Sequence, residues 1–172
     1  MNFIDHTTNW IQGEIFEASL TTIAGILVLI GTALLWKYGV SAAARGLILS
    51  LLIAGLIMSA GGASTFLSNQ KRMAELSENQ NQPVREFILQ EKQRVEAFMP
   101  WYQYVRVIAT VLLITSIGAI WLSNSSTLHA IALALMFLAL SALVIDHFSQ
   151  ARAQIYYQEI LQFERLATLE GQ

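Results

Sequence analysis

The sequence contains no cysteine among its 172 residues, and this absence excludes several kinds of site. Without cysteine there is no disulfide, no thiolate ligand for zinc or an iron–sulfur cluster, and no cysteine nucleophile. Charge is also scarce, because Asp, Glu, Lys and Arg make up 13% of the chain against about 25% in typical soluble domains. The formal net charge of -2 lacks the basic excess that attracts nucleic acid, so no nucleic-acid partner is expected.

Apolar residues are abundant, at 55% of the sequence. Four stretches have the length of roughly 17–25 residues that crosses a bilayer core of about 30 Å as a helix. Unpaired backbone amides are costly in lipid, so each stretch is expected to be helical. Arg106, at the edge of the third stretch, is expected to extend its side chain to the membrane interface. The predicted spans are 18–36, 46–67, 104–122 and 128–145.

These spans predict an all-α fold, namely an integral membrane four-helix bundle of two transmembrane hairpins with cytoplasmic helical extensions. The whole chain, residues 1–172, is expected to be a single membrane domain. Residues 68–103 are predicted to form a cytoplasmic helical region, and residues 147–169 a C-terminal cytoplasmic helix. Acidic residues rather than basic ones precede the first span, so this span is not expected to be a cleaved signal peptide.

Both extensions carry apolar residues at helical spacing. We expect the two apolar stripes to pack on each other; docking on the membrane surface or on a partner is the alternative. Pro100 is expected to end the middle helix or to open the third span. The stripes are Val84, Phe87, Ile88, Val95, Phe98 and Met99 in the middle region, and Tyr156, Ile160, Phe163 and Ala167 near the C-terminus. Glu86, Glu91 and Glu96 are expected to form a solvated face.

The distribution of Lys and Arg predicts the orientation. Eight of the ten basic residues lie in the termini, the middle region or its edge, and only Lys37 and Arg45 lie in the two short loops. Because cytoplasmic loops carry the excess of positive charge, both termini are predicted to be cytoplasmic. The chain is therefore expected to be a multi-pass protein of the bacterial inner (plasma) membrane. Trp10 and Tyr102 are expected at the inner membrane interface.

Small residues form a ridge on the second span. Gly55, Ser59 and Ala63 are spaced by four and Gly62 lies beside them, a pattern that lets another helix approach closely. The ridge is interpreted as a helix-packing contact within the chain, with a homo-oligomer contact as the alternative.

Charged residues near the inner ends of the spans suggest two further contacts. Asp146 of the fourth span should lie level with Arg106 of the third, which predicts an ion pair at the inner interface. Lys71, Arg72 and Arg152 are candidates for contact with anionic lipid headgroups. No ionisable group is expected inside a span, which weighs against pumps and proton relays.

No motif indicates catalysis, a cofactor or a metal. His129 and His147 stand 18 residues apart in the fourth span, about 27 Å along a helix, too far to hold one haem or metal ion together. Phosphate-binding loops, dinucleotide fingerprints and nucleophile elbows are absent from the sequence. We therefore expect no catalytic residues, no cofactor and no enzymatic activity.

The topology, with four spans, cytoplasmic termini and no buried charge, resembles that of immunity proteins that protect bacteria from pore-forming toxins. The resemblance covers the topology alone and implies contact with a toxin's inserting helices inside the membrane. The sequence thus favours a non-enzymatic interaction protein that lies in the lipid bilayer and binds a protein partner through its spans or cytoplasmic helices. An accessory subunit of a membrane complex is a second form of this role. A small oligomeric channel or facilitator is the alternative.

Overall fold

Four long helices make up nearly all of residues 3–78 and 83–169, which the computed structural model describes. They are α1 (Phe3–Tyr38), α2 (Ala42–Glu78), α3 (Val84–Leu122) and α4 (Ser126–Leu169). The shortest has 36 residues and the longest 44, which corresponds to about 54–66 Å at the rise of an α-helix. Each helix is therefore about twice as long as a bilayer core is thick.

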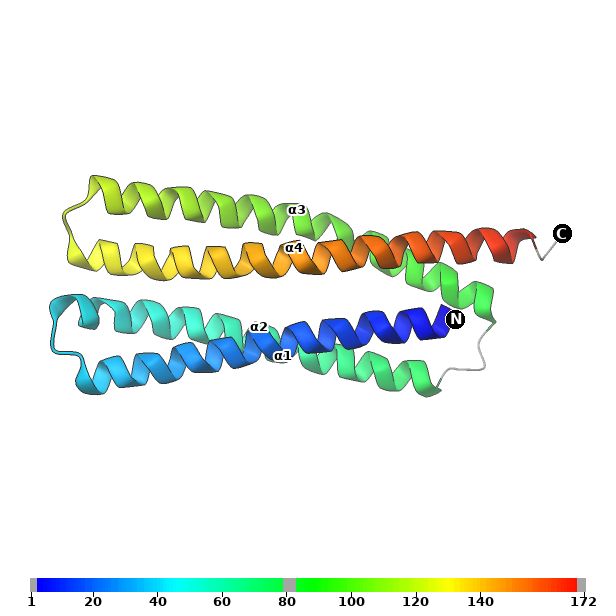
Figure 1. The fold of residues 1–172 in the computed structure, drawn as a ribbon, viewed down its shortest axis with the longest axis horizontal. Helices are drawn as coiled ribbons and strands as arrows, with labels where there is room; N and C mark the ends of the chain where they lie inside the picture. Colours follow the sequence, from blue (N-terminus) through cyan, green and yellow to red (C-terminus); the bar gives the residue numbers. More distant parts are fainter. Residues whose placement is uncertain (1–2, 79–82, 170–172) are drawn as a thin grey trace.

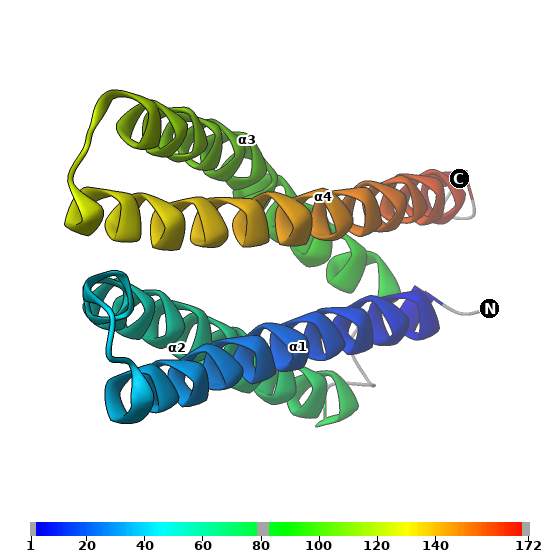
Figure 2. The same ribbon diagram turned by 60° about the vertical axis from the view of Figure 1, so that its left-hand side comes forward.

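The helices form two hairpins that lie side by side and point the same way, as Figures 1 and 2 show. The first hairpin is α1 and α2, and the second is α3 and α4. Both short connections lie at one end of the molecule, the loop end, on the left of Figure 1. The start of α1, the end of α2, the start of α3 and the end of α4 lie toward the opposite end, the terminal end. The predicted all-α bundle of two hairpins is confirmed.

Each helix contains an apolar window that is long enough to cross a membrane. No more than 22% of the residues in any window are buried inside the protein, so most of these apolar side chains face outward. An outward apolar surface of this extent matches lipid and not water. The chain is accordingly a multi-pass membrane protein.

Glycines bring α1 and α2 into close contact. A Cβ atom on Gly25 would lie 2.5 Å from the backbone nitrogen of Ser59, and one on Gly62 would lie 2.7 Å from that of Thr22. Gly55 is buried as well, and a Cβ atom added to it would lie 2.9 Å from the Leu29 side chain. The ridge predicted on the second span therefore packs against α1 of the same chain, which is the intramolecular interpretation of the pattern.

The hairpins contact each other near the loop end, where a Cβ atom added to Gly46 of α2 would lie 3.1 Å from the Ala130 side chain of α4, and again at the terminal end. Here the helices continue beyond the apolar spans and form the terminal bundle, which we define as residues 3–17, 68–78, 84–103 and 147–169. Its core joins the two predicted stripes, and α1 adds a residue that the sequence analysis did not single out. The buried core residues are Phe3, Ile88, Val95, Tyr156 and Ile160.

Pro100 lies inside the continuous helix α3, so the expectation that it ends or opens a helix is wrong. A proline removes one backbone hydrogen bond from a helix. Contacts with α4 hold α3 on both sides of this position. The Tyr157 hydroxyl donates to Glu96 at 2.7 Å, and the hydroxyls of Tyr102 and Ser149 are 3.2 Å apart.

Two neighbouring glycines provide a matched test of the α1–α2 contact. Gly62→Ala is expected to destabilise the protein by about 1–3 kcal/mol, because the new methyl group overlaps the α1 backbone. Gly61→Ala should be neutral or slightly stabilising, since no atom lies within 4 Å of its added Cβ and alanine favours helix. The thermal unfolding midpoints of the two variants in detergent, monitored by circular dichroism, test both expectations. Equal midpoints for the two variants would contradict the proposed close contact.

Candidate functional site

Cavities follow the seam where α4 faces α1 and α2. The largest, which we call the seam cavity, has a volume of about 750 Å³ and lies between α1 and α4, with Met58 of α2 also lining it. A second cavity of about 230 Å³ shares Met58 and Ser141 with it. A third of about 230 Å³ shares Ile57 and Leu138 with the second. The three cavities therefore adjoin along the seam.

Polar groups gather toward the terminal end of this seam. The seam cavity is lined mainly by apolar side chains, but Glu17, Thr21, Ser141 and Arg152 also reach it. The third cavity, nearer the loop end, has Ser50 as its one polar lining residue in the part of the chain that the structure describes. The seam is thus apolar along most of its length and charged at one end.

Arg152 joins two carboxylates at this charged end. Its Nη2 atom donates to Glu14 Oε1 at 3.0 Å and also contacts Glu17 Oε2. Burial raises the pKa of the Glu14 carboxyl, against the opposing charge of Arg152. Burial also raises the pKa of the Glu17 carboxyl to about 7, again opposed by Arg152.

The structure brings Arg106 and Asp146 together, as the sequence analysis expects. Arg106 Nη2 lies 3.4 Å from Asp146 Oδ2, and the aspartate is 4% exposed while the arginine is half exposed. The same guanidinium contacts Gln150 one turn further along α4. This pair ties α3 to α4 within the second hairpin.

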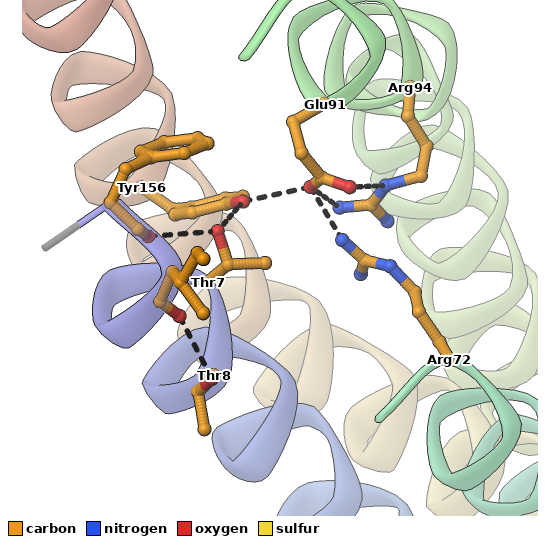
Figure 3. Close-up of polar contacts among 8 residues, drawn as sticks. Thr7, Thr8, Arg72, Glu91, Arg94 and Tyr156 are labelled. Carbon is orange, nitrogen blue, oxygen red and sulfur yellow. Dashed lines mark hydrogen bonds and ion pairs between the residues drawn. The ribbon is translucent and has the colours of Figure 1, made fainter. Parts of the chain in front are cut away.

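A second polar cluster lies inside the terminal bundle, as shown in Figure 3. Glu91 is 6% exposed and accepts hydrogen bonds from Arg72 at 2.5 Å, Arg94 at 2.8 Å and the Tyr156 hydroxyl at 2.8 Å. The Tyr156 and Thr7 hydroxyls are 2.9 Å apart. Since Thr7 belongs to α1, Arg72 to α2 and Tyr156 to α4, this cluster joins all four helices.

The expected solvated position of Glu91 is therefore wrong. Burial acts to raise the pKa of its carboxyl, but hydrogen bonds and charge from Arg94 and Arg72 outweigh burial and lower the pKa below its ordinary value. The carboxylate is thus held ionised inside the bundle. One sequence signal pointed to this position, because Glu91 falls at helical spacing within the apolar stripe between Ile88 and Val95.

Trp10 lies beside this cluster. The guanidinium carbons of Arg72 and Arg94 are 4.9 and 4.8 Å from the centre of its ring. Its ring also stacks on Tyr156 at 5.1 Å and on Phe98 at 5.9 Å. The bundle thus offers the indole both aromatic and cationic partners, and its position at the inner membrane interface stays a prediction.

The three residues expected at lipid headgroups have different surroundings. Lys71 is 80% exposed and lies 3.7 Å from Glu75. Arg72 and Arg152 instead take internal partners, Glu91 for the first and the Glu14–Glu17 pair for the second. Their ion pairs lie within the bundle, and contact of the two arginines with lipid headgroups stays a prediction.

The potential metal ligands lie apart from one another. Within residues 3–78 and 83–169, no three His, Asp or Glu side chains are grouped closely enough to hold a metal ion. No protein-family model, curated protein or solved structure matches the chain. The class that the fold defines is an all-α, multi-pass membrane protein, and its candidate sites are the seam cavity and the cluster around Glu91.

Removing the charge of Glu91 is expected to destabilise the terminal bundle strongly. Glu91→Gln leaves the guanidiniums of Arg72, 17% exposed, and Arg94, 33% exposed, without their anionic partner, which should cost about 2–4 kcal/mol, less than the loss of a fully buried pair. Glu86→Gln, at an exposed position of the same helix, should change stability by less than about 0.5 kcal/mol. Denaturant unfolding in mixed micelles compares the two variants. A similarly small effect of both substitutions would contradict the inference that the Glu91 carboxylate stabilises the terminal bundle.

The proton on Glu17 gives a pH-dependent prediction. Because its pKa rises to about 7 on folding, the folded protein binds the proton more tightly than the unfolded chain does. This contribution is present at acidic pH and is lost as the pH rises through about 7. Glu17→Gln should thus be more stable than the unaltered protein at pH 8, by about 1–3 kcal/mol, and equal to it only below about pH 4.5, the ordinary pKa of the carboxyl. Thermal midpoints across this range test the prediction, and a constant difference would contradict it.

Proposed function

We propose that the protein is a non-enzymatic interaction protein of the bacterial inner membrane that binds an apolar helix of a protein partner along the seam between its hairpins. The terminal bundle lies in the cytoplasm in this proposal, because eight of the ten Lys and Arg residues are on that side of the spans. The observation that carries the proposal is the row of adjoining cavities between α4 and the first hairpin.

The shape of the seam supports a helical occupant. Its lining residues on α4 extend from Ile131 to Ile155, which is about 36 Å along a helix. A groove of this length matches a membrane-spanning segment better than a compact molecule. The seam cavities open to the outside of the bundle, so apolar side chains of a partner can enter them and gain van der Waals contacts there.

The chemistry of the seam favours lateral binding over conduction. Polar side chains are restricted to its terminal end, while the cavity nearer the loop end is almost entirely apolar. An aqueous path requires polar lining along its length. Immunity to a pore-forming toxin, through contact with its inserting helices, is one form of the proposed role. An accessory subunit of a membrane complex is the other.

Photo-crosslinking in native membranes tests this proposal. A photoreactive residue at Ala24, in the seam cavity, is expected to give discrete protein adducts. The same residue at Ile114, 63% exposed on α3, should give none. Ser141→Trp, which fills the cavity, should abolish the adducts from position 24 by at least about tenfold. Leu133→Trp, a lipid-facing change on the same helix, should not affect them.

Two outcomes contradict the proposal. Adducts of equal yield from positions 24 and 114 would indicate random contact with membrane proteins. Adducts from position 24 that persist in Ser141→Trp would show that the partner does not occupy the seam.

A further inference from the structure

The charged end of the seam contains a carboxylate that an occupant would cover. Glu17 lines both the seam cavity and the second cavity beside it, and its side chain is 18% exposed. Apart from Thr21, Ser141 and Arg152, the residues that line the seam cavity with Glu17 are apolar. Apolar side chains of a partner that enter the seam would therefore separate this carboxylate from water.

Two carboxylates share one guanidinium at this point. Arg152 Nη2 donates to Glu14 at 3.0 Å and also contacts Glu17. The guanidinium lies against α1 at Gly13, where an added Cβ atom would be 2.7 Å from Nη1. With both carboxylates ionised, the three side chains carry one net negative charge. With one of them protonated, they are neutral.

The hydrogen bonds indicate which carboxylate takes the proton. Glu14 also accepts a hydrogen bond from the Ser149 hydroxyl at 3.5 Å. Glu17 has only Arg152 as a polar side-chain partner within the part of the chain that the structure describes. Burial raises the pKa of Glu17 against the effect of Arg152, and the negative charge of Glu14 adds to the rise. Glu17 is therefore the less stabilised of the two anions.

The other helices present mainly neutral groups to Glu17. On α3, Tyr102 is the titratable neighbour, and burial raises the pKa of its hydroxyl, so it stays neutral. On α4, the charge of Asp146 is compensated by Arg106. The residues of α2 that line the second cavity with Glu17 are uncharged: Ile57, Met58, Gly61, Gly62 and Thr65.

We propose that occupation of the seam by an apolar helix is coupled to the uptake of one proton by Glu17, so that the partner binds more tightly as the pH falls. The inference rests on the proposed function, which supplies the occupant. An ionised carboxylate that loses its water and shares its only counter-charge is costly, whereas a neutral carboxyl is not. The proton comes from water at the terminal end, and Arg152 then pairs with Glu14 alone. The occupied seam thus ends in a neutral carboxyl and one balanced ion pair.

A filled cavity tests this coupling without a partner. Ser141→Trp places an indole in the two cavities that Glu17 also lines. The Glu17 carboxyl of the full-length protein in lipid nanodiscs can be titrated by carbon-13 NMR, with Glu17→Gln to assign the signal. In Ser141→Trp this carboxyl should bind its proton at least about threefold more tightly than in the unaltered protein.

Two further variants complete the titration. Ser141→Leu fills the same space with a smaller side chain and should change proton binding in the same direction. Leu133→Trp, at a position 45% exposed on the same helix, is the matched control and should leave the titration unchanged. Unaltered proton binding in both variants of Ser141, or an equal change in Leu133→Trp, would overturn the coupling.

Partner binding provides the second test. Adducts from a photoreactive residue at position 24 should form in at least about threefold higher yield at pH 6 than at pH 8. Glu17→Gln, which is neutral at both values, should give yields that do not depend on pH. Equal yields from the protein with Glu17, or a higher yield at pH 8, would overturn the coupling. Absence of adducts at both values would contradict the proposed function instead, and the titration of Ser141→Trp would still decide whether a filled seam binds the proton more tightly.

Discussion

The buried carboxylate of Glu91 is the point on which the arrangement of the two hairpins depends. It accepts hydrogen bonds from α2, α3 and α4, and the Tyr156 hydroxyl extends the network to α1. Apolar helices in lipid gain little from the hydrophobic effect when they associate, so they need other interactions to fix their relative positions. The hydrogen bonds to the Glu91 carboxylate fix these positions, because sliding of any one helix along its axis would break them.

The strength of packing changes along the molecule. Within the first hairpin, glycines bring two backbones together, and at the terminal end aromatic rings and ion pairs join both hairpins. Between the hairpins, Ala130 of α4 packs closely on Gly46 of α2 near the loop end, and cavities follow the seam between this contact and the terminal bundle. The two hairpins are therefore attached near both ends, and the cavities lie between these attachments.

The spans and hairpins could be predicted from the sequence because a bilayer imposes length and hydropathy directly on each helix. The Arg106–Asp146 contact was predictable for a similar reason, since neighbouring antiparallel helices bring residues of equal depth together. The predicted exposure of Glu91 was wrong because its charge indicates solvent, although its helical spacing within the apolar stripe indicates burial. The decisive partner, Arg72, comes from another helix, and no local pattern shows which helices will meet.

The contacts of α1 with the second hairpin were unpredictable on the same grounds. Phe3, Thr7 and Trp10 precede the first span and show no pattern that names their neighbours. The two carboxylates that pair with Arg152 also belong to α1. Such contacts depend on how one hairpin docks on the other, and docking is a property of the whole bundle.

The length of the helices has a mechanical consequence. Each hairpin is a pair of unbroken helices that run from the terminal end to the loop end. A rotation of one hairpin by about 5° about the terminal end would displace its loop end by about 5–6 Å, given helices of roughly 54–66 Å. That displacement is about half the diameter of a helix. The contact of Gly46 with Ala130 near the loop end opposes such a rotation, so the second attachment fixes the relative angle of the two long hairpins.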